Sequence, residues 1–321
     1  MNKKNRYYVG VFALEMFLIG FMLFFNFSPF VLGEVGENAT VVSYLEIGNV
    51  YPEILNISVD NYASEVILIG NSTKEVYCQA IIRDFNNETN FDSVYAEFYN
   101  SSWGGSDDNN YHYTNNSCDI VTEFGTWNGI SDSIYTALAN CTFDVLYYSN
   151  PGEWNCTMVV TDDEGLNATG DDNVTMAELL SVGLPTSINY GIINATYVSG
   201  EEVADVTNYG NVEIDVAISG YAISEGDGLA MNCTLGSLQN ISIEYEKYNV
   251  SDSTSGSLSL TEFENNYINL TESPVTEDYN LAFRQDDVTN EAYNSTYWRI
   301  YVPTGVAGTC QGNIVFGAVK S

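Results

Sequence analysis

Apolar and polar residues alternate with a period of two along much of this 321-residue chain. Between Trp154 and Val160 the aromatic, cysteine and aliphatic side chains take every second place, with Asn155 and Thr157 between them. Residues 212–218 repeat the pattern with Val and Ile against acidic residues. Because successive side chains of a strand point to opposite faces, the pattern predicts half-buried antiparallel strands and an all-β fold.

Turn signals rich in Asn, Asp, Gly and Pro separate these runs, roughly every ten to fifteen residues, a spacing typical of β-sandwiches. The chain is also long enough to bury two separate cores. The stretch MAELLSVGLP, residues 176–185, breaks the alternation and is the predicted linker. We therefore expect one sandwich domain over residues 35–175 and a second over residues 186–321.

The N-terminus has the composition of an export segment. Lys3, Lys4 and Arg6 precede an apolar stretch, and no charged residue lies between Met16 and Gly33. A basic start followed by an apolar core is typical of a secretory signal, and the uncharged length also reaches the lower limit of a membrane span. Residues 1–33 are therefore predicted to be a cleaved signal peptide or a retained N-terminal membrane anchor helix.

A third interpretation of the same segment rests on Gly10, followed by an apolar run with Glu15 five residues later. This arrangement resembles the N-terminus of type IV pilin precursors. In that family the chain is cut after the glycine, and the glutamate helps subunits assemble through apolar helices. The sequence departs from the family at Val9, where a basic residue is usual.

Beyond the leader, Asn-x-Ser/Thr triplets occur about three times as often as the roughly six that chance placement of 36 Asn would give. The excess predicts glycan acceptors on exposed strands and loops of an exported glycoprotein. The sixteen candidate acceptors are Asn38, Asn56, Asn71, Asn87, Asn100, Asn115, Asn140, Asn155, Asn167, Asn173, Asn194, Asn232, Asn240, Asn249, Asn269 and Asn294.

Six cysteines lie beyond the leader, at Cys78, Cys118, Cys141, Cys156, Cys233 and Cys310. An even number in an exported chain predicts a disulfide framework, for which six cysteines allow 15 connectivities. No Cys-x-x-Cys pair occurs in the sequence, so a structural zinc site is disfavoured. Cysteines and candidate glycan acceptors thus agree on a secreted or cell-surface protein.

The segment PGEWNCTMVVTDDEG, residues 151–165, resembles the penultimate strand and hairpin turn of immunoglobulin-like and PKD-like domains. Two later segments, residues 208–220 and 301–318, look like the early and final strands of Ig-like repeats in archaeal surface proteins. PKD's own Trp-Asp-Phe-Gly-Asp-Gly signature is absent, so the resemblance is to the broader Ig-like class. It implies two tandem Ig-like β-sandwiches.

The same resemblance implies a disulfide pairing. Cys78 and Cys156 occupy inward places that Ig-like domains give their second and sixth strands, beside Trp154. Cys118 and Cys141 are then the remaining pair of the first predicted domain. Cys233 and Cys310 are the two cysteines of the second, and domains rarely share a bridge across a linker.

The formal net charge of −34 disfavours binding to nucleic acid and to anionic lipid, so contact with a membrane is expected only through the N-terminal segment. Acidic clusters could supply oxygens to calcium, and each also fits a turn whose Asp side chains cap the backbone. We expect no cofactor and leave calcium open as the alternative. The clusters are Asp107-Asp108, Asp162-Asp163-Glu164 and Asp171-Asp172.

Catalytic signals are absent from the sequence. The single histidine, His112, lies in the polar stretch NNYHYTNN and is expected in a solvated loop. The loop around it carries Trp103, Tyr111 and Tyr113, which form a candidate site for a glycan or a partner protein. The alternative is an ordinary connection whose aromatic rings pack onto the sandwich.

These features favour a non-catalytic, extracellular structural or adhesion-type surface protein, with other surface proteins or glycans as partners. The alternative is a subunit of an extracellular, pilus-like filament, which would assemble with copies of itself.

Overall fold

The computed structural model describes residues 40–251, 253–287 and 291–321. The predicted signal or anchor helix over residues 1–33 and the candidate acceptor Asn38 lie outside this range. The chain divides into two units, Met1–Gly48 and Asn49–Ser321. In the first unit, residues 40–48 form neither helix nor strand. Among the described residues, no helix is both long and apolar enough to cross a membrane.

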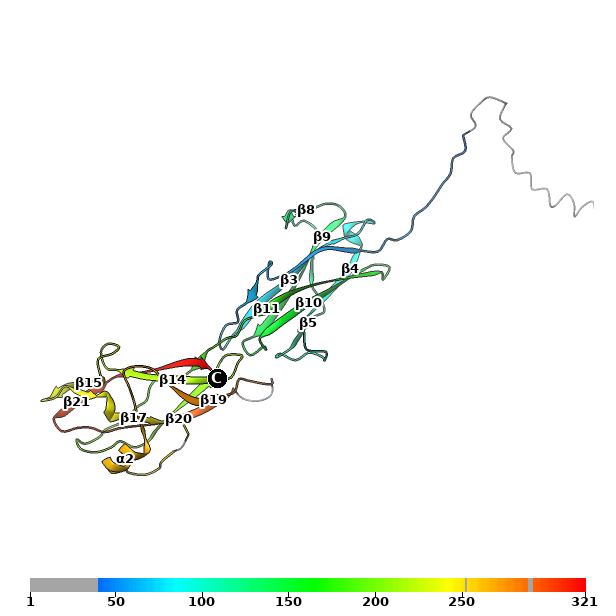
Figure 1. The fold of residues 1–321 in the computed structure, drawn as a ribbon. Helices are drawn as coiled ribbons and strands as arrows, with labels where there is room; N and C mark the ends of the chain where they lie inside the picture. Colours follow the sequence, from blue (N-terminus) through cyan, green and yellow to red (C-terminus); the bar gives the residue numbers. More distant parts are fainter. Residues whose placement is uncertain (1–39, 252, 288–290) are drawn as a thin grey trace, which may run out of the picture. The chain divides into compact units, whose positions relative to one another are not determined.

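The described chain is an all-β sandwich fold with a single short α-helix, α2 (Leu260–Asn266) (Figure 1). Strands β1–β11 form one group of sheets, here called the N-terminal strand set. Its first large sheet has the order β1 (Glu53–Val59), β3 (Thr73–Arg83), β9 (Thr136–Leu146), β6 (Asp119–Val121). Its second has the order β2 (Glu65–Val66), β11 (Asn167–Met176), β10 (Gly152–Asp162), β4 (Phe91–Asn100), β5 (His112–Asn115). A small hairpin joins β7 (Thr126–Trp127) to β8 (Ile130–Ser131), and the 3₁₀ turn η1 spans Glu88–Asn90.

The two large sheets enclose one apolar core, and the period-two pattern explains why. On β10 the side chains of Trp154, Cys156, Met158 and Val160 are all 0% exposed, as the alternation predicts. Pairing is antiparallel throughout this set except between β11 and β2, whose short contact is parallel. The buried face of each long strand thus comes directly from its sequence.

Strands β12–β22 form the second group, the C-terminal strand set, coloured green to red in Figure 1. Three sheets build it. The largest has the order β12 (Val182–Gly183), β13 (Glu202–Asn208), β20 (Tyr293–Ile300), β17 (Glu246–Asn249), β18 (Ile268–Asn269). The others are β19 (Val275–Leu281), β14 (Ile214–Tyr221), β22 (Asn313–Lys320), and β16 (Asn240–Ser242), β15 (Leu229–Gly236), β21 (Val306–Gln311). The 3₁₀ turn η2 spans Ile243–Tyr245.

Within the described residues, no sheet contains strands of both sets. The predicted linker, residues 176–185, holds the last residue of β11 and the whole of β12, which already pairs with β13. The buried side chain of Asn211 holds this connection in place through hydrogen bonds. Its Nδ2 donates to Ser149 O (2.9 Å) and Ala177 O (3.0 Å), and its Oδ1 accepts from Leu179 N (2.7 Å). Both sets belong to the compact unit Asn49–Ser321, and the division into two domains stays a prediction.

Candidate functional site

The aromatic residues of the predicted ligand loop do not form one surface. Trp103 and Tyr111 stack on each other, with ring centroids 4.5 Å apart and planes 10° from parallel. Tyr113 instead lies on β5 and packs towards Trp154, with ring centroids 6.0 Å apart. Its hydroxyl donates to Asn109 O (2.7 Å) and accepts from Leu146 N (3.0 Å). Burial raises the pKa of Tyr113 to about 12. The ring therefore packs against the sheet and does not face solvent.

The expectation that His112 lies in a solvated loop is wrong. It is the first residue of β5, and its side chain is only 8% exposed. Pairing of β5 with β4 places the ring 5.8 Å from that of Tyr99. The Nδ1 atom lies 2.7 Å from Asp107 Oδ1, and Nε2 lies 3.9 Å from the Glu97 carboxylate. The acidic residue Asp107 therefore orients the histidine.

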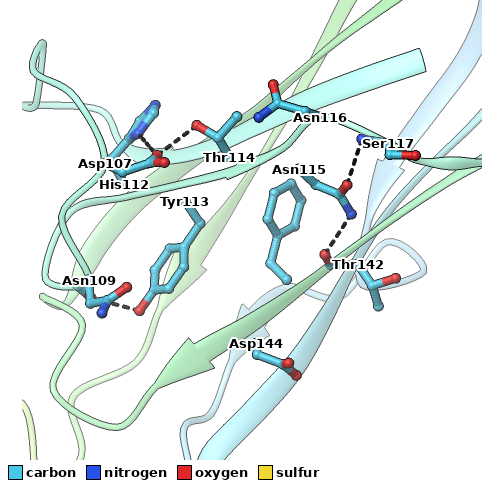
Figure 2. A pocket seen from close by; sticks show the side chains of 11 residues that line it. Asp107, Asn109, His112, Tyr113, Thr114, Asn115, Asn116, Ser117, Thr142 and Asp144 are labelled. Atoms are coloured by element: carbon cyan, nitrogen blue, oxygen red, sulfur yellow. Dashed lines mark hydrogen bonds and ion pairs between the residues drawn. The ribbon is translucent and has the colours of Figure 1, made fainter. Parts of the chain in front are cut away.

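A pocket of about 440 Å³ opens beside this pair (Figure 2). The Thr114 hydroxyl donates to Asp107 Oδ1 (2.6 Å), and Asn115 Nδ2 donates to Thr142 O (3.0 Å). Carboxylates and amides of this kind can bind hydroxyl groups of a ligand. The Thr114 hydroxyl, however, is directed at a carboxylate and not at the imidazole, so the geometry lacks the nucleophile–base hydrogen bond of acyl transfer.

Asn115 is also a candidate glycan acceptor, and its position bears on the same pocket. Its Oδ1 accepts from Ser117 N (3.0 Å), the amide two residues later in the triplet. Because Asn115 lines the pocket, a glycan on this residue would cover it. Ligand binding in the pocket and modification of Asn115 are thus alternatives.

The other candidate acceptors differ in exposure. Asn100 is the least accessible: it is 6% exposed, and its Oδ1 accepts from Ser102 N and Oγ. A glycan there would require this turn to open. The half-buried candidates are Asn56, Asn87, Asn115, Asn140, Asn155 and Asn249. The exposed candidates are Asn71, Asn167, Asn173, Asn194, Asn232, Asn240, Asn269 and Asn294.

The six cysteines form three disulfides, and these join the same pairs that the Ig-like resemblance implies. Cys78–Cys156 connects β3 to β10 and so links the two large sheets of the N-terminal strand set. Cys118–Cys141 joins the segment before β6 to β9. Cys233–Cys310 joins β15 to β21, which are neighbours in one sheet.

The acidic clusters take part in turns and loop contacts. Asp108 Oδ1 accepts from Asn110 N (2.9 Å), Asp162 Oδ1 from Leu166 N (2.7 Å), and Asp172 Oδ2 from Val59 N (3.0 Å). Over the described ranges, no group of three or more His, Cys, Asp or Glu side chains lies close enough together to hold a metal ion.

A second polar site, in the C-terminal strand set, has no clear signal in the sequence. Two pockets of about 380 and 550 Å³ share Ile188, Tyr190 and Met231 among their lining residues. Glu246 lines the first and is 1% exposed; its Oε1 accepts from the Tyr190 hydroxyl (2.8 Å). Burial raises the pKa of Glu246 to about 7. The sequence IEYEKY does not distinguish this glutamate from the exposed Glu244.

Comparisons with known proteins give little guidance. No protein-family model matches the sequence, and no curated protein matches it. The structure has likenesses to solved structures, and those named here are at 10% identity or less. Among them are carbohydrate-binding modules of the β-sandwich superfamily (10% identity, 85% of this chain and 99% of that chain, TM-score 0.24). Another is native Escherichia coli alpha-2-macroglobulin (9% identity, 84% of this chain and 17% of that chain, TM-score 0.26). A third is the C-terminal domain of the Streptococcus agalactiae AgI/II polypeptide BspA (8% identity, 84% of this chain and 99% of that chain, TM-score 0.22). At these TM-scores the likenesses carry no conclusion about the role of this chain.

Proposed function

We propose that this chain is a non-catalytic, extracellular structural or adhesion-type surface protein. In this proposal, residues 1–33 direct export, and two Ig-like sandwiches follow, separated at residues 176–185. The observation that carries it is the combination of disulfide-linked β-sheets with candidate glycan acceptors on exposed strands and loops. Disulfides persist in oxidising compartments, and Asn-linked glycans are added to exported chains.

The chemistry of the pockets supports a non-catalytic role. His112 lies against carboxylates, and Glu246 lies against a tyrosine hydroxyl. In both places the polar groups are held by hydrogen bonds to one another. The pocket at His112 suits a weakly bound hydroxyl-rich ligand, such as a glycan of a neighbouring surface protein, because carboxylates and amides both line it.

A second candidate function, a subunit of an extracellular filament, is favoured by residues 40–48. This segment is rich in apolar side chains, and it exposes Val41 (88%), Tyr44 (92%), Leu45 (86%) and Ile47 (76%). An extended apolar segment of this kind can add a strand to the open sheet edge of a second copy. Self-assembly through residues 40–48 would supply the contact that a filament needs.

Protein isolated from its native source tests both functions. A surface protein should have an intact mass above 35.4 kDa that falls on deglycosylation, and a mature N-terminus near Glu34 or at Met1. A filament subunit should begin at Val11, form fibres in electron micrographs, and lose them when residues 40–48 are deleted. An unmodified mass, with the protein recovered from the cytoplasm, would contradict export and both functions.

A further inference from the structure

Two buried aspartates lie at the end of the N-terminal strand set where β3 and β10 terminate. Asp84 follows the last residue of β3 and is 0% exposed, and Asp162 is the last residue of β10 and is 1% exposed. Main-chain hydrogen bonds fix both positions: Asp84 N donates to Tyr135 O (2.8 Å), and Asp162 N donates to Leu166 O (3.0 Å). Buried carboxylates at fixed positions require partners for their oxygens.

Both carboxylate oxygens of Asp162 have hydrogen-bond partners, whereas only one oxygen of Asp84 has one. Asp162 Oδ1 accepts from Leu166 N and Glu164 N, and its Oδ2 accepts from Asn49 Nδ2 (2.6 Å). Asp84 Oδ1 accepts from Asn86 N (2.7 Å). Asp84 Oδ2, by contrast, is buried and has no hydrogen-bond partner. A carboxylate oxygen left in this state costs free energy comparable to a lost hydrogen bond.

Asn49 brings a second unpartnered oxygen to the same place. While its Nδ2 donates to Asp162, its Oδ1 is buried and has no partner. The next residue extends these contacts towards Asp84, because Val50 N donates to Asn86 Oδ1 (2.9 Å) and Asn86 N in turn donates to Asp84 Oδ1. Asn49, Asp84 and Asp162 thus belong to one hydrogen-bonded group.

The charges of this group are not balanced by the neighbouring cation. Arg83, next to Asp84 in the sequence, pairs with Glu53, and its guanidinium lies 4.6 Å from the ring centre of Phe85. The carboxylates of Asp162 and Asp163 lie near enough to Asp84 to repel its negative charge. A bound cation would remove this repulsion and supply a partner for both orphaned oxygens.

We propose that Asn49 Oδ1, Asp84 Oδ2 and Asp162 Oδ2 form a calcium-binding site that closes this end of the N-terminal strand set. The donors are all oxygens and mix carboxylate with amide, which suits Ca²⁺. Zinc prefers nitrogen and sulfur ligands, and magnesium demands a stricter octahedron. Because the set contains two acids and one amide, it differs from the clusters of three acidic side chains that are absent from the described residues.

Calcium at this position would join three separate segments of the chain. Asn49 precedes β1, Asp84 follows β3, and Asp162 ends β10. This inference does not depend on the proposed function, since it concerns only the contacts within residues 49–162.

Calorimetric titration of the full chain with CaCl₂, after treatment with EDTA and dialysis, tests the site. The unmodified protein should bind calcium, and its unfolding midpoint should rise by about 5 °C or more at saturation. Asp84→Asn removes the orphaned charge with little change of shape. It should weaken calcium binding at least about tenfold, while its calcium-free midpoint should equal or exceed that of the unmodified protein. Asp171→Asn, on an exposed position of β11, is the matched control and should keep the full response.

A second variant keeps the test decisive if Asp84→Asn does not fold. Asn49→Ala alters a residue outside the strands and should also weaken calcium binding about tenfold. Absence of binding heat and of a midpoint shift in the unmodified protein would overturn the site. Undiminished binding by the folded variants, or loss of binding in Asp171→Asn, would place calcium elsewhere and overturn it too. An equal midpoint shift with magnesium would overturn the assignment to calcium.

Discussion

The two strand sets are both all-β, but they are stabilised by different means. The N-terminal set has one continuous apolar core, which includes Trp154, Phe98 and Met158. The C-terminal set has two smaller buried clusters, one around Trp298 and one around Cys233. In the second set three sheets share these two smaller clusters.

The C-terminal strand set also buries charged side chains. In the C-terminal set Arg299 is 0% exposed, Glu246 1% and Lys247 6%, and all three lie on β17 or β20 of the same sheet. The buried acids of the N-terminal set, by contrast, lie where strands end. Both sets have disulfides and apolar clusters, but only the second buries charged side chains of two neighbouring strands within a sheet. The two sets should therefore respond differently to loss of disulfides and to pH.

Removal of a disulfide should give the largest effect. The double substitution Cys78→Ala, Cys156→Ala opens a loop of 78 residues and should cost about 4 kcal/mol of unfolding free energy. Since this bridge joins the two large sheets, hydrogen exchange should rise throughout β3, β9 and β10. Before these variants are made, peptide mapping of the unmodified chain without reduction should recover three bonded pairs: Cys78–Cys156, Cys118–Cys141 and Cys233–Cys310.

The matched control is Cys233→Ala, Cys310→Ala, which opens a loop of 77 residues. Its cysteines lie on paired strands of one small sheet, so exchange should rise in β15 and β21 and leave the N-terminal set protected. Equal exchange in both sets after either double substitution would show that they unfold as one unit. That result would contradict the proposed division at residues 176–185.

Arg299 gives the next largest effect. Its Nη1 donates to Ser199 O (2.7 Å), its Nη2 donates to Thr254 O and Gly256 O, and its Nε donates to the Tyr267 hydroxyl (3.0 Å). Arg299→Leu would leave the buried Ser199 carbonyl without this donor and remove the bonds to Thr254 O and Gly256 O, at a cost of about 3 kcal/mol measured by urea unfolding.

Arg83→Leu is the matched control for Arg299→Leu. Arg83 pairs with Glu53, and the two side chains are 33% and 47% exposed. Water screens such a pair, so the expected loss is below about 1 kcal/mol. Similar losses for the two arginine variants would contradict the view that buried polar partners stabilise the C-terminal set.

The same contrast explains how much could be predicted from the sequence. The strands of the first set were predictable because inward residues of β10 follow strict alternation and all are fully buried. The pairing of Cys78 with Cys156 could be inferred from a resemblance, since it lies at a recurrent position of Ig-like sandwiches. The predicted division into two domains and the export segment stay predictions.

Other features depend on contacts between distant segments, which local patterns do not contain. His112 is buried because β5 pairs with β4, although the sequence around it is polar. Glu246 and Glu244 occupy equivalent places in an alternating stretch, yet only Glu246 meets the tyrosine hydroxyl of a segment more than fifty residues earlier. The oxygens at Asn49 and Asp84 likewise come from segments that are far apart in the chain.

Glu246 sharpens the comparison through pH, with an expected effect similar to that of Arg299→Leu. Its pKa is about 7 in the folded chain, above the ordinary value of 4.5, so folding favours the protonated form. Its contribution to stability is therefore fully present below about pH 4.5 and is lost as the pH rises through 7. The shift corresponds to a loss of about 3 kcal/mol above pH 7. Urea unfolding of the C-terminal set, followed from pH 4.5 to 8, measures it.

Glu246→Gln should abolish this pH dependence, because the amide oxygen still accepts from Tyr190 and carries no charge. The variant should match the unmodified protein near pH 4.5 and exceed it at pH 8. Burial causes the shift and the Tyr190 hydroxyl opposes it, while Glu202 on β13 adds negative charge near that tyrosine. Glu244→Gln, at an exposed position, is the control and should leave the profile unchanged. An unmodified protein whose C-terminal set is equally stable at both pH values would show that the Glu246 carboxylate reaches water, and the contrast between the two strand sets would then rest on Arg299 alone.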